Sequence, residues 1–220
     1  MKKEKAFRII AEQRVLPLFF EPSAVHAASV LEALYRAGIR TIEYTNRGPE
    51  ALATFTKLKR ELESRFPDLQ LGAGTILSVE QARQFMDCGA DYIVSPAVVP
   101  EVGDFVHSSG LLWIPGCMTP TEIYSARTSG ASLIKIFPGS VLGPSYISQI
   151  RELFPGQEFM VTGGVEPSSE SLAGWFQSGV SVVGIGSKLI TKSIVAEKNW
   201  DLLYEKTRQL IHLADGVAAP

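Results

Sequence analysis

Short apolar runs rich in valine and isoleucine alternate along the chain with segments whose apolar residues recur at helical spacing. Runs of this length bounded by turn residues are typical of buried strands. The pattern predicts eight strands, at residues 14–20, 41–45, 70–76, 91–95, 111–115, 131–138, 158–162 and 181–185.

A helical pattern follows each predicted strand, and glycine or proline marks several of the boundaries. Gly38 is placed to end one helix, and Pro49 is placed to begin the next. An additional helix is predicted before the first strand, at residues 3–12. The remaining predicted helices are 24–37, 49–66, 79–88, 101–108, 121–128, 146–154, 169–177 and 196–213.

Eight consecutive strand–helix units indicate an α/β protein with parallel strands joined by helical crossovers. Eight is the number that closes a (β/α)8 TIM barrel, and 220 residues suit a compact one. An open doubly wound sheet is the competing architecture, but it usually has a glycine-rich turn after its first strand, and this chain has Phe20-Glu-Pro-Ser instead. Since composition shows no linker, we expect residues 1–220 to form a single domain, a barrel with an extra N-terminal helix.

The composition excludes several classes of function. The net charge is −2 and there is no basic run, which argues against nucleic-acid binding. No segment is apolar for long enough to span a bilayer or to act as a signal peptide, so we expect a cytoplasmic protein. The two cysteines suggest reduced thiols, and the three histidines lie far apart without metal-ligand spacing. No metal or other cofactor is expected.

Lys135 is the residue that most constrains the function. It lies in an apolar strand, on the same face as Leu133 and Phe137 because side chains alternate along a strand. A buried ammonium is costly unless it is paired or loses its proton. The neutral amine is a nucleophile that attacks carbonyl groups and forms Schiff bases.

Other polar residues lie near the carboxyl ends of the predicted strands, where barrel enzymes place their active sites. A glutamate in one strand and a lysine in another, facing one cavity, favour a catalytic pair over a merely structural ion pair. The residues concerned are Glu43, Thr45, Arg47, Thr75, Pro96, Lys135 and Thr162.

Glycine-rich turns follow the last two strands. Thr162 is followed by Gly163 and Gly164, and Gly186-Ser187 closes the eighth strand. Glycine lets backbone N–H groups approach an anion, and these two loops form the usual phosphate site of a TIM barrel.

Taken together, these segments resemble the class I aldolases of 2-keto-3-deoxy-6-phosphogluconate (KDPG) and 4-hydroxy-2-oxoglutarate. The resemblance runs from about Arg14 to Ser187 and depends on the order and spacing of several short motifs. These are Ile42-Glu-Tyr-Thr-Asn-Arg47, Gly72-Ala-Gly-Thr75, Ser95-Pro96, Pro115-Gly116, Thr119-Pro120 with Glu122, Ile134-Lys-Ile-Phe-Pro138 and Thr162-Gly-Gly164.

The resemblance implies a role for each matching residue. Lys135 would form the Schiff base and Glu43 would be the general acid and base, with a keto-deoxy sugar acid phosphate as substrate and pyruvate as one product. It also implies a homotrimer. The remaining matches are Arg47 and Thr75 at the carboxylate, Pro96 and Phe137 flanking the keto acid, Thr162 at a substrate hydroxyl, and Gly163, Gly164, Gly186 and Ser187 at the phosphate.

Some positions depart from the family pattern. Ile185 replaces a glycine at the phosphate turn, and Lys188 replaces an aromatic residue, so that it either adds charge near a phosphate or faces solvent. These departures affect sugar stereochemistry more than reaction type. The alternatives are therefore an aldolase for 4-hydroxy-2-oxoglutarate or for the galactonate epimer of KDPG, or a phosphate-binding barrel without catalysis.

Overall fold

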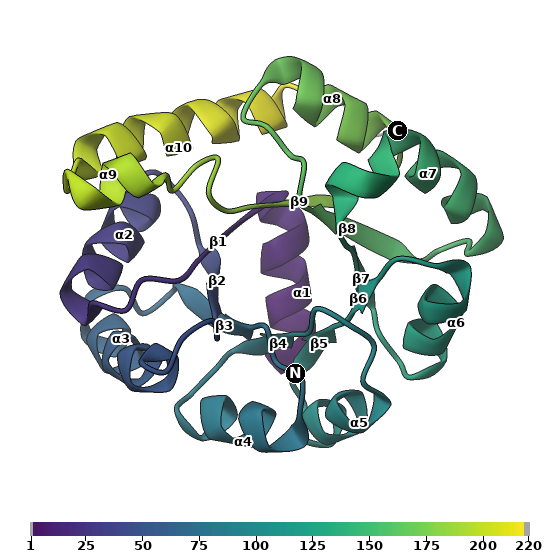
Figure 1. Cartoon of the computed structure of the whole chain (residues 1–220), viewed down its shortest axis with the longest axis horizontal. Helices are drawn as coiled ribbons and strands as arrows, with labels where there is room; N and C mark the ends of the chain where they lie inside the picture. Colours follow the sequence, from purple (N-terminus) through teal and green to yellow (C-terminus); the bar gives the residue numbers. More distant parts are fainter. Residues whose placement is uncertain (1, 218–220) are drawn as a thin grey trace.

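Eight strand–helix units form a ring of parallel strands surrounded by helices in the computed structural model, which describes residues 2–217 except for the side chain of Glu63. Figure 1 shows the ring of strands inside the ring of helices, and this confirms the predicted (β/α)8 barrel. The strands are β1 (Val15–Phe19), β2 (Thr41–Thr45), β3 (Gln70–Gly74), β4 (Tyr92–Val94), β5 (Leu112–Ile114), β6 (Gly116–Cys117), β7 (Leu133–Ile136), β8 (Glu158–Thr162) and β9 (Val182–Ile185).

The helices begin largely where the sequence supplies capping residues. At the start of α6 the Thr119 hydroxyl accepts from the Glu122 N–H, while the Glu122 carboxylate accepts from the Thr119 N–H, which satisfies two otherwise unpaired amides. The helices are α1 (Lys2–Gln13), α2 (Ala24–Arg36), α3 (Ala51–Arg65), α4 (Val79–Asp87), α5 (Pro100–Ser108), α6 (Pro120–Thr128), α7 (Gly139–Leu153), α8 (Ser169–Gln177), α9 (Lys192–Ala196) and α10 (Trp200–Asp215).

The fifth strand, predicted to end at Pro115, continues past that residue as a second short strand, β6. Residues before Pro115 pair with β4 and residues after it pair with β7, so β5 and β6 form the two ends of the sheet order. Proline has no N–H to donate, which interrupts a strand ladder. The Pro115 carbonyl still accepts a hydrogen bond from the Lys135 N–H at 2.9 Å. The sheet therefore returns on itself through this one divided strand.

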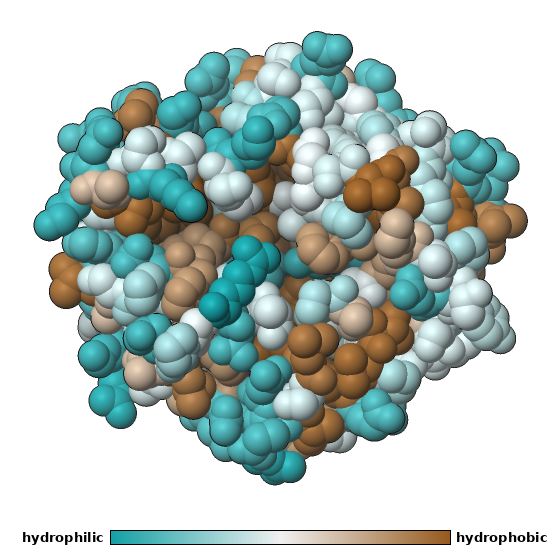
Figure 2. All heavy atoms as spheres, in the orientation of Figure 1, coloured by the Kyte–Doolittle hydropathy of each residue, from teal (hydrophilic) through white to brown (hydrophobic). Residues whose placement is uncertain are grey.

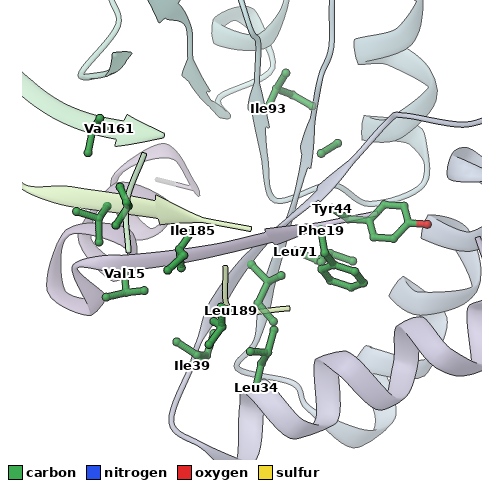
Figure 3. Packing of buried hydrophobic residues seen from close by; sticks show 14 of the residues in the cluster. Val15, Phe19, Leu34, Ile39, Tyr44, Leu71, Ile93, Val161, Ile185 and Leu189 are labelled. Atoms are coloured by element: carbon green, nitrogen blue, oxygen red, sulfur yellow. The ribbon is translucent and has the colours of Figure 1, made fainter. Parts of the chain in front are cut away.

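Two apolar cores lie on opposite faces of the strands. The outer core fills the space between the strands and the helices, and Figure 3 shows Val15 and Ile185 there with Leu34 and Ile39. The inner core fills the barrel, and includes Leu16, Tyr92, Leu112, Leu133, Met160 and Val182. Strand residues alternate between the two cores, as the two-residue period of a strand requires.

Helix α1 closes one end of the barrel. Ala6 and Ile10 are fully buried and belong to the inner core, with Phe7 packed beside them. Figure 1 shows α1 crossing the middle of the ring of strands. The extra N-terminal helix predicted from the sequence is thus present, and it completes the hydrophobic interior.

The helix after β7 begins earlier than the sequence pattern indicated. We expected it to start at Tyr146, but α7 begins at Gly139. Its backbone departs from helical geometry at Gly143, with φ 74° and ψ 168°, directly before Pro144. Because Gly143 and Pro144 both disfavour helix, the sequence pattern indicated a loop before Tyr146. The structure instead has a short helical turn there, which a kink at Gly143 separates from the rest of α7.

The end of the chain also differs from the expectation of one helix over residues 196–213. A short helix, α9, precedes α10, and the Asn199 side chain accepts from the Leu202 N–H to begin the second helix.

Figure 2 shows polar side chains over much of the rim and apolar groups gathered in parts of the face shown. Among the described helices, none has the length and apolar character needed to cross a membrane.

Candidate active site

Lys135 and Glu43 face each other inside the barrel. The distance from Lys135 Nζ to Glu43 Oε2 is 3.6 Å, and their side chains are 7% and 1% exposed. The Lys135 ammonium also lies over the Phe137 ring, 5.5 Å from its centroid. The structure therefore brings together the buried amine and carboxylate that were predicted from strands far apart in the sequence.

Glycines of β3 make room for the bulky groups of the interior. A Cβ added to Gly74 would overlap the Glu43 carboxylate, and one added to Gly72 would overlap the Tyr92 ring. The hydroxyl of Thr41 donates to Tyr92 Oη at 3.0 Å in the layer below Glu43. Burial raises the pKa of Tyr92 far above its usual range, so that hydroxyl stays protonated. The side chains of Thr41 and Tyr92, on the side of Glu43 away from the cavity, therefore carry no charge.

Two buried side-chain oxygens of neighbouring parts of the barrel make no hydrogen bond with the described residues: Glu43 Oε2, which lies 3.6 Å from the lysine, and Thr162 Oγ1. Buried polar atoms are nearly always paired, so unpaired ones call for an explanation. Gly184, the β9 neighbour of Thr162, leaves space next to this hydroxyl, since a Cβ there would overlap it. Both oxygens are positioned to bond to a molecule that enters the barrel.

The other residues predicted for the keto acid lie at the rim. Arg47 is exposed just past β2, and its side chain makes no hydrogen bond or ion pair with the described part of the chain. Thr75 follows β3 with φ 62°, a conformation rare for a β-branched residue and typical of functional sites. Pro96 follows β4, and Gly116 lacks a side chain where the Pro96 carbonyl passes.

A cavity of about 780 Å³ opens at the carboxyl ends of the strands. Lys135 and Glu43 do not line it, because both are buried beneath it, but Phe137 belongs to the lining and also contacts Lys135. Phe137 therefore lies between the cavity and the buried pair. The predicted residues that line the cavity are Arg47, Phe137, Thr162, Gly163, Gly164, Gly186 and Ser187.

The glycine turns lie on one side of this cavity. Gly163 and Gly164 have φ values of 88° and 76°, which side chains rarely adopt, and Gly164 packs against the backbone of Ser140. Ile185, the departure from the family pattern, is 1% exposed and packs in the outer core (Figure 3). Its side chain therefore takes almost no space from the cavity.

Lys188 lies at the edge of the same cavity and pairs with Glu166. The distance from Lys188 Nζ to Glu166 Oε1 is 2.7 Å, with both side chains about half exposed. We expected Lys188 either to add charge near a phosphate or to face solvent. Neither alternative describes it fully, because it lies at the cavity rim and already pairs with an anionic side chain.

Sequence reasoning missed several residues of the cavity wall. Glu21 and His26 come from the loop and helix after β1, and Lys192 comes from α9. Glu21 could have been found by the rule that selected Arg47, because it is a charged residue directly after a strand. The role of α9 could not, because that short helix was not predicted.

A second cavity, of about 900 Å³, lies at the opposite end of the barrel beside the start of β8. It is lined by charged residues that include Arg14, Arg151 and Glu158, and by none of the predicted site residues. Size alone therefore does not identify the site; the buried reactive groups do.

Other reactive side chains do not compete with Lys135. Burial raises the pKa of the Cys117 thiol to about 12, so it stays protonated at neutral pH. Within residues 2–217 no three or more His, Cys, Asp or Glu side chains are grouped so as to hold a metal ion.

Comparison with known proteins agrees with this geometry. The family model for KDPG and KHG aldolase matches residues 7–205. A probable 2-dehydro-3-deoxy-6-phosphogalactonate aldolase of Rhizobium meliloti is 36% identical over 74% of this chain and 75% of its own length. A 2-dehydro-3-deoxy-phosphogluconate aldolase of Treponema pallidum is 34% identical over 72% of this chain and 74% of its own.

Among solved structures, the KDPG aldolase of Legionella pneumophila, with pyruvate captured as a covalent carbinolamine, has a TM-score of 0.83 and 27% identity. The match covers 92% of this chain and 96% of the other. Barrel, buried lysine and family model all agree, and the chain belongs to the KDPG and KHG aldolase family.

Proposed function

We propose that this protein is a class I aldolase that cleaves KDPG to pyruvate and glyceraldehyde 3-phosphate, with Lys135 as the Schiff-base lysine. The observation that carries the proposal is the buried Lys135–Glu43 pair, 3.6 Å apart. It lies near a cavity lined by the glycine-rich turns that were predicted to bind phosphate. A protein that only bound phosphate would have no use for a nucleophile placed below its binding site.

The first half of the reaction forms a covalent bond between enzyme and substrate. The neutral Lys135 amine attacks the C2 ketone and gives a carbinolamine, whose hydroxyl leaves as water with a proton delivered by Glu43. The product is a protonated Schiff base, and its cationic nitrogen withdraws electrons from C3. Glu43 Oε2, which faces Lys135 Nζ and makes no hydrogen bond with the described residues, is the atom that would accept and return these protons.

The second half breaks the C3–C4 bond. Glu43, directly or through water, removes the proton of the C4 hydroxyl, and the bonding electrons move toward the Schiff-base nitrogen. Glyceraldehyde 3-phosphate is released and an enamine of pyruvate stays on Lys135. Protonation at C3 and hydrolysis of the Schiff base release pyruvate and restore the amine.

The rim residues would orient the substrate for this chemistry. The Arg47 guanidinium, which has no partner among the described residues, can hold the substrate carboxylate with two parallel hydrogen bonds, assisted by Thr75. Pro96 and Phe137 flank the keto acid, and Thr162 Oγ1 meets a substrate hydroxyl. Gly163, Gly164, Gly186 and Ser187 supply backbone and hydroxyl groups for the phosphate.

Reduction with borohydride in the presence of pyruvate tests the proposal directly. The Schiff base would be reduced to a stable secondary amine, and mass spectrometry of the digested protein should find the added mass on the peptide that contains Lys135. An unmodified Lys135 peptide after this treatment would refute the mechanism. A Lys135→Met variant is the control that should not be labelled.

The galactonate epimer is a second candidate substrate, because the Rhizobium meliloti relative is named as a phosphogalactonate aldolase. The two substrates differ in configuration at C4, one of the two carbons joined by the bond that breaks. Comparison of kcat/KM for the two epimers, with 4-hydroxy-2-oxoglutarate as a third substrate, decides among them.

We also infer that the active form is a homotrimer, as the family resemblance implies. Large apolar side chains that are exposed in the single chain support this, including Tyr124 at 64% and Val141 at 67%, from neighbouring units of the barrel. Sedimentation equilibrium should give three times the chain mass of 23.9 kDa. A mass equal to one chain at micromolar concentration would contradict the trimer.

We place the enzyme in the cytoplasm. The free thiols Cys88 and Cys117 suit a reducing compartment. Fractionation of cells with an antibody against the protein tests this location.

A further inference from the structure

Glu21 is a partly buried carboxylate in the wall of the substrate cavity that the mechanism does not use. It directly follows the region of β1, and β1 lies between β2 and β9 in the barrel. Arg47 follows β2, and Gly186 with Ser187 follows β9. Glu21 therefore lies between the residues proposed for the two charged ends of the substrate, and all four line one cavity.

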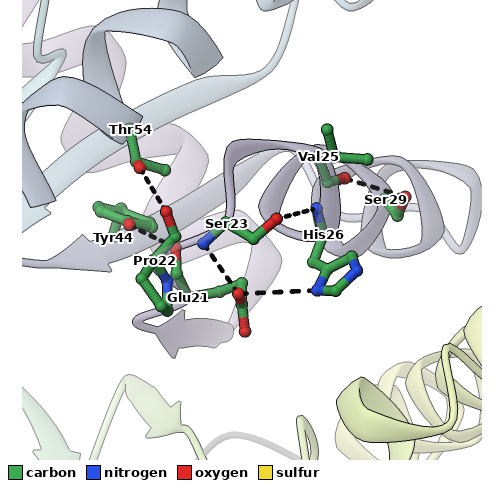
Figure 4. A network of polar contacts seen from close by, with 8 residues as sticks. All are labelled: Glu21, Pro22, Ser23, Val25, His26, Ser29, Tyr44 and Thr54. Carbon is green, nitrogen blue, oxygen red and sulfur yellow. Dashed lines mark hydrogen bonds and ion pairs between the residues drawn. The ribbon is translucent and has the colours of Figure 1, made fainter. Parts of the chain in front are cut away.

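The position of Glu21 is fixed by its neighbours. Its Oε1 accepts a hydrogen bond from the Ser23 N–H at 2.9 Å and is 3.8 Å from His26 Nδ1. The Tyr44 hydroxyl donates to the Glu21 carbonyl oxygen at 2.8 Å, and the Glu21 side chain is 14% exposed. Figure 4 shows these contacts holding the carboxylate at the start of α2.

The second carboxylate oxygen, Oε2, has no hydrogen bond to any described residue. In Figure 4 it points away from Ser23 and His26, and Glu21 is part of the cavity lining. An ionised carboxylate can only accept hydrogen bonds, so the group that completes it must be a donor. A phosphate dianion would be repelled, whereas a hydroxyl group would be bound.

We propose that Glu21 is a specificity-determining residue that accepts a hydrogen bond from the C5 hydroxyl of the substrate. The inference rests on the proposed function, since C5 lies between the bond broken above Lys135 and the phosphate-bearing C6. Thr162 lies deeper in the barrel and faces the hydroxyl nearer the reacting bond, so Glu21, at the rim, meets the next hydroxyl outward.

When a bound substrate covers Glu21 without supplying a donor, the carboxylate loses water and gains no hydrogen bond, so the enzyme rejects substrates that lack the hydroxyl. Sites built to bond a hydroxyl discriminate strongly against analogues without it, because the unpaired group stays desolvated. Glu21 would also keep the phosphate away from this part of the wall and direct it toward the glycine turns.

The test is run in the synthetic direction, with pyruvate and two aldehydes. Glyceraldehyde 3-phosphate supplies the C5 hydroxyl, and 3-oxopropyl phosphate is the same aldehyde without it. The readout is kcat/KM for glyceraldehyde 3-phosphate divided by kcat/KM for 3-oxopropyl phosphate. For Glu21→Ala we expect this ratio to fall at least tenfold, as loss of a hydrogen bond to a charged group implies. An unchanged ratio overturns the proposal.

Glu21→Gln is the second variant, and it decides the question if the alanine variant does not fold. Its amide oxygen has the same reach but no charge, so we expect a drop of about threefold to tenfold in the ratio. Ser23→Ala is the matched control: it removes the hydroxyl that caps α2 but keeps the N–H that holds Glu21, and the ratio should not change. A ratio lowered equally by Ser23→Ala would assign the effect to the loop.

Exchange of the pyruvate methyl protons with deuterium, followed by NMR, separates the two proposals. This exchange requires the enamine on Lys135 but no aldehyde. Its absence in the unmodified protein would refute the aldolase mechanism, whereas exchange together with an unchanged aldehyde ratio in Glu21→Ala and Glu21→Gln would refute only the role of Glu21.

Discussion

The chemistry proposed for this protein depends on two side chains that contribute little to its stability. A buried ion pair seldom stabilises a fold, because desolvation of both charges offsets their attraction. Glu43 Oε2 lies 3.6 Å from Lys135 Nζ, beyond hydrogen-bond distance, and is left without a hydrogen bond in the described structure. Such a pair is therefore better explained by reaction than by folding.

Glu43→Gln should lower kcat by about a hundredfold or more, the usual contribution of a general acid and base. The amide keeps the size of the carboxylate but cannot transfer protons. Pyruvate release coupled to lactate dehydrogenase measures the effect, and Glu12→Gln, on the exposed face of α1, is the control. A fully active Glu43→Gln enzyme would reduce Glu43 to an ion-pair partner of Lys135.

At this scale the sequence singled out the two residues that the structure brings together, because a lysine and a glutamate in apolar strands are conspicuous. It missed Glu21, whose importance depends on how its two oxygens are bonded. The partners of a single carboxylate oxygen cannot be read from the order of residues. They become apparent only when the loop after β1 and helix α2 are placed in space (Figure 4).

A glycine in one strand of the barrel leaves room for a side chain of the neighbouring strand. Gly74 lies on β3 next to Glu43 on β2, and a Cβ there would overlap the carboxylate. Gly74→Ala should thus displace Glu43 and lower kcat far more than it lowers thermal stability. Gly174→Ala, on α8, is the matched control: its Cβ would make an ordinary 3.8 Å contact, and we expect about 0.5–1 kcal/mol of stabilisation.

A displaced Glu43 should also be visible in the pyruvate exchange assay as a slower rate. Equal exchange rates for Gly74→Ala and Gly174→Ala would show that β3 does not position the glutamate.

Helix α5 packs against β5 through His107, whose ring meets Trp113 edge to face with centroids 6.1 Å apart. Burial, with a smaller effect of Lys3, lowers the pKa of His107 in the folded protein. Below about pH 6.5 the unfolded chain therefore binds more protons than the folded one, and the free energy of unfolding falls as the pH drops.

Urea unfolding at pH 7.5 and pH 5 checks this effect. His107→Phe keeps the aromatic contact but cannot bind a proton, so it should lose less stability between the two pH values than the unmodified protein. His212→Gln, on the exposed side of α10, should behave like the unmodified protein. Equal losses for all three proteins would contradict the assigned role of His107.

Element boundaries show where sequence patterns fail. The continuation of the fifth strand past Pro115 as β6 was not predicted, because a proline followed by a glycine usually ends a strand. The early start of α7 was hidden by Gly143 and Pro144, which are poor helix formers. In both cases the neighbouring strands and helices, and not local propensity, determine the observed structure.

The whole molecule depends on α1 to complete its interior. Ile10 is fully buried in the inner core, whereas Arg8 on the same helix has a side chain 69% exposed. Ile10→Ala should cost about 2–5 kcal/mol in the free energy of unfolding, as do other deletions of large buried side chains. Arg8→Ala should cost less than about 0.5 kcal/mol. Equal, small losses in urea unfolding would show that the interior does not need α1.

Closure of one end by α1 has a kinetic consequence. Both reaction partners must pass through the same opening, and pyruvate is bonded at the inner end of the path while the aldehyde lies nearer the entrance. In synthesis, pyruvate must therefore arrive first, and an aldehyde that enters early blocks the way to the amine. We expect excess aldehyde to inhibit competitively with respect to pyruvate. Closure of one end of the barrel by α1 would thus make the binding of the two substrates ordered.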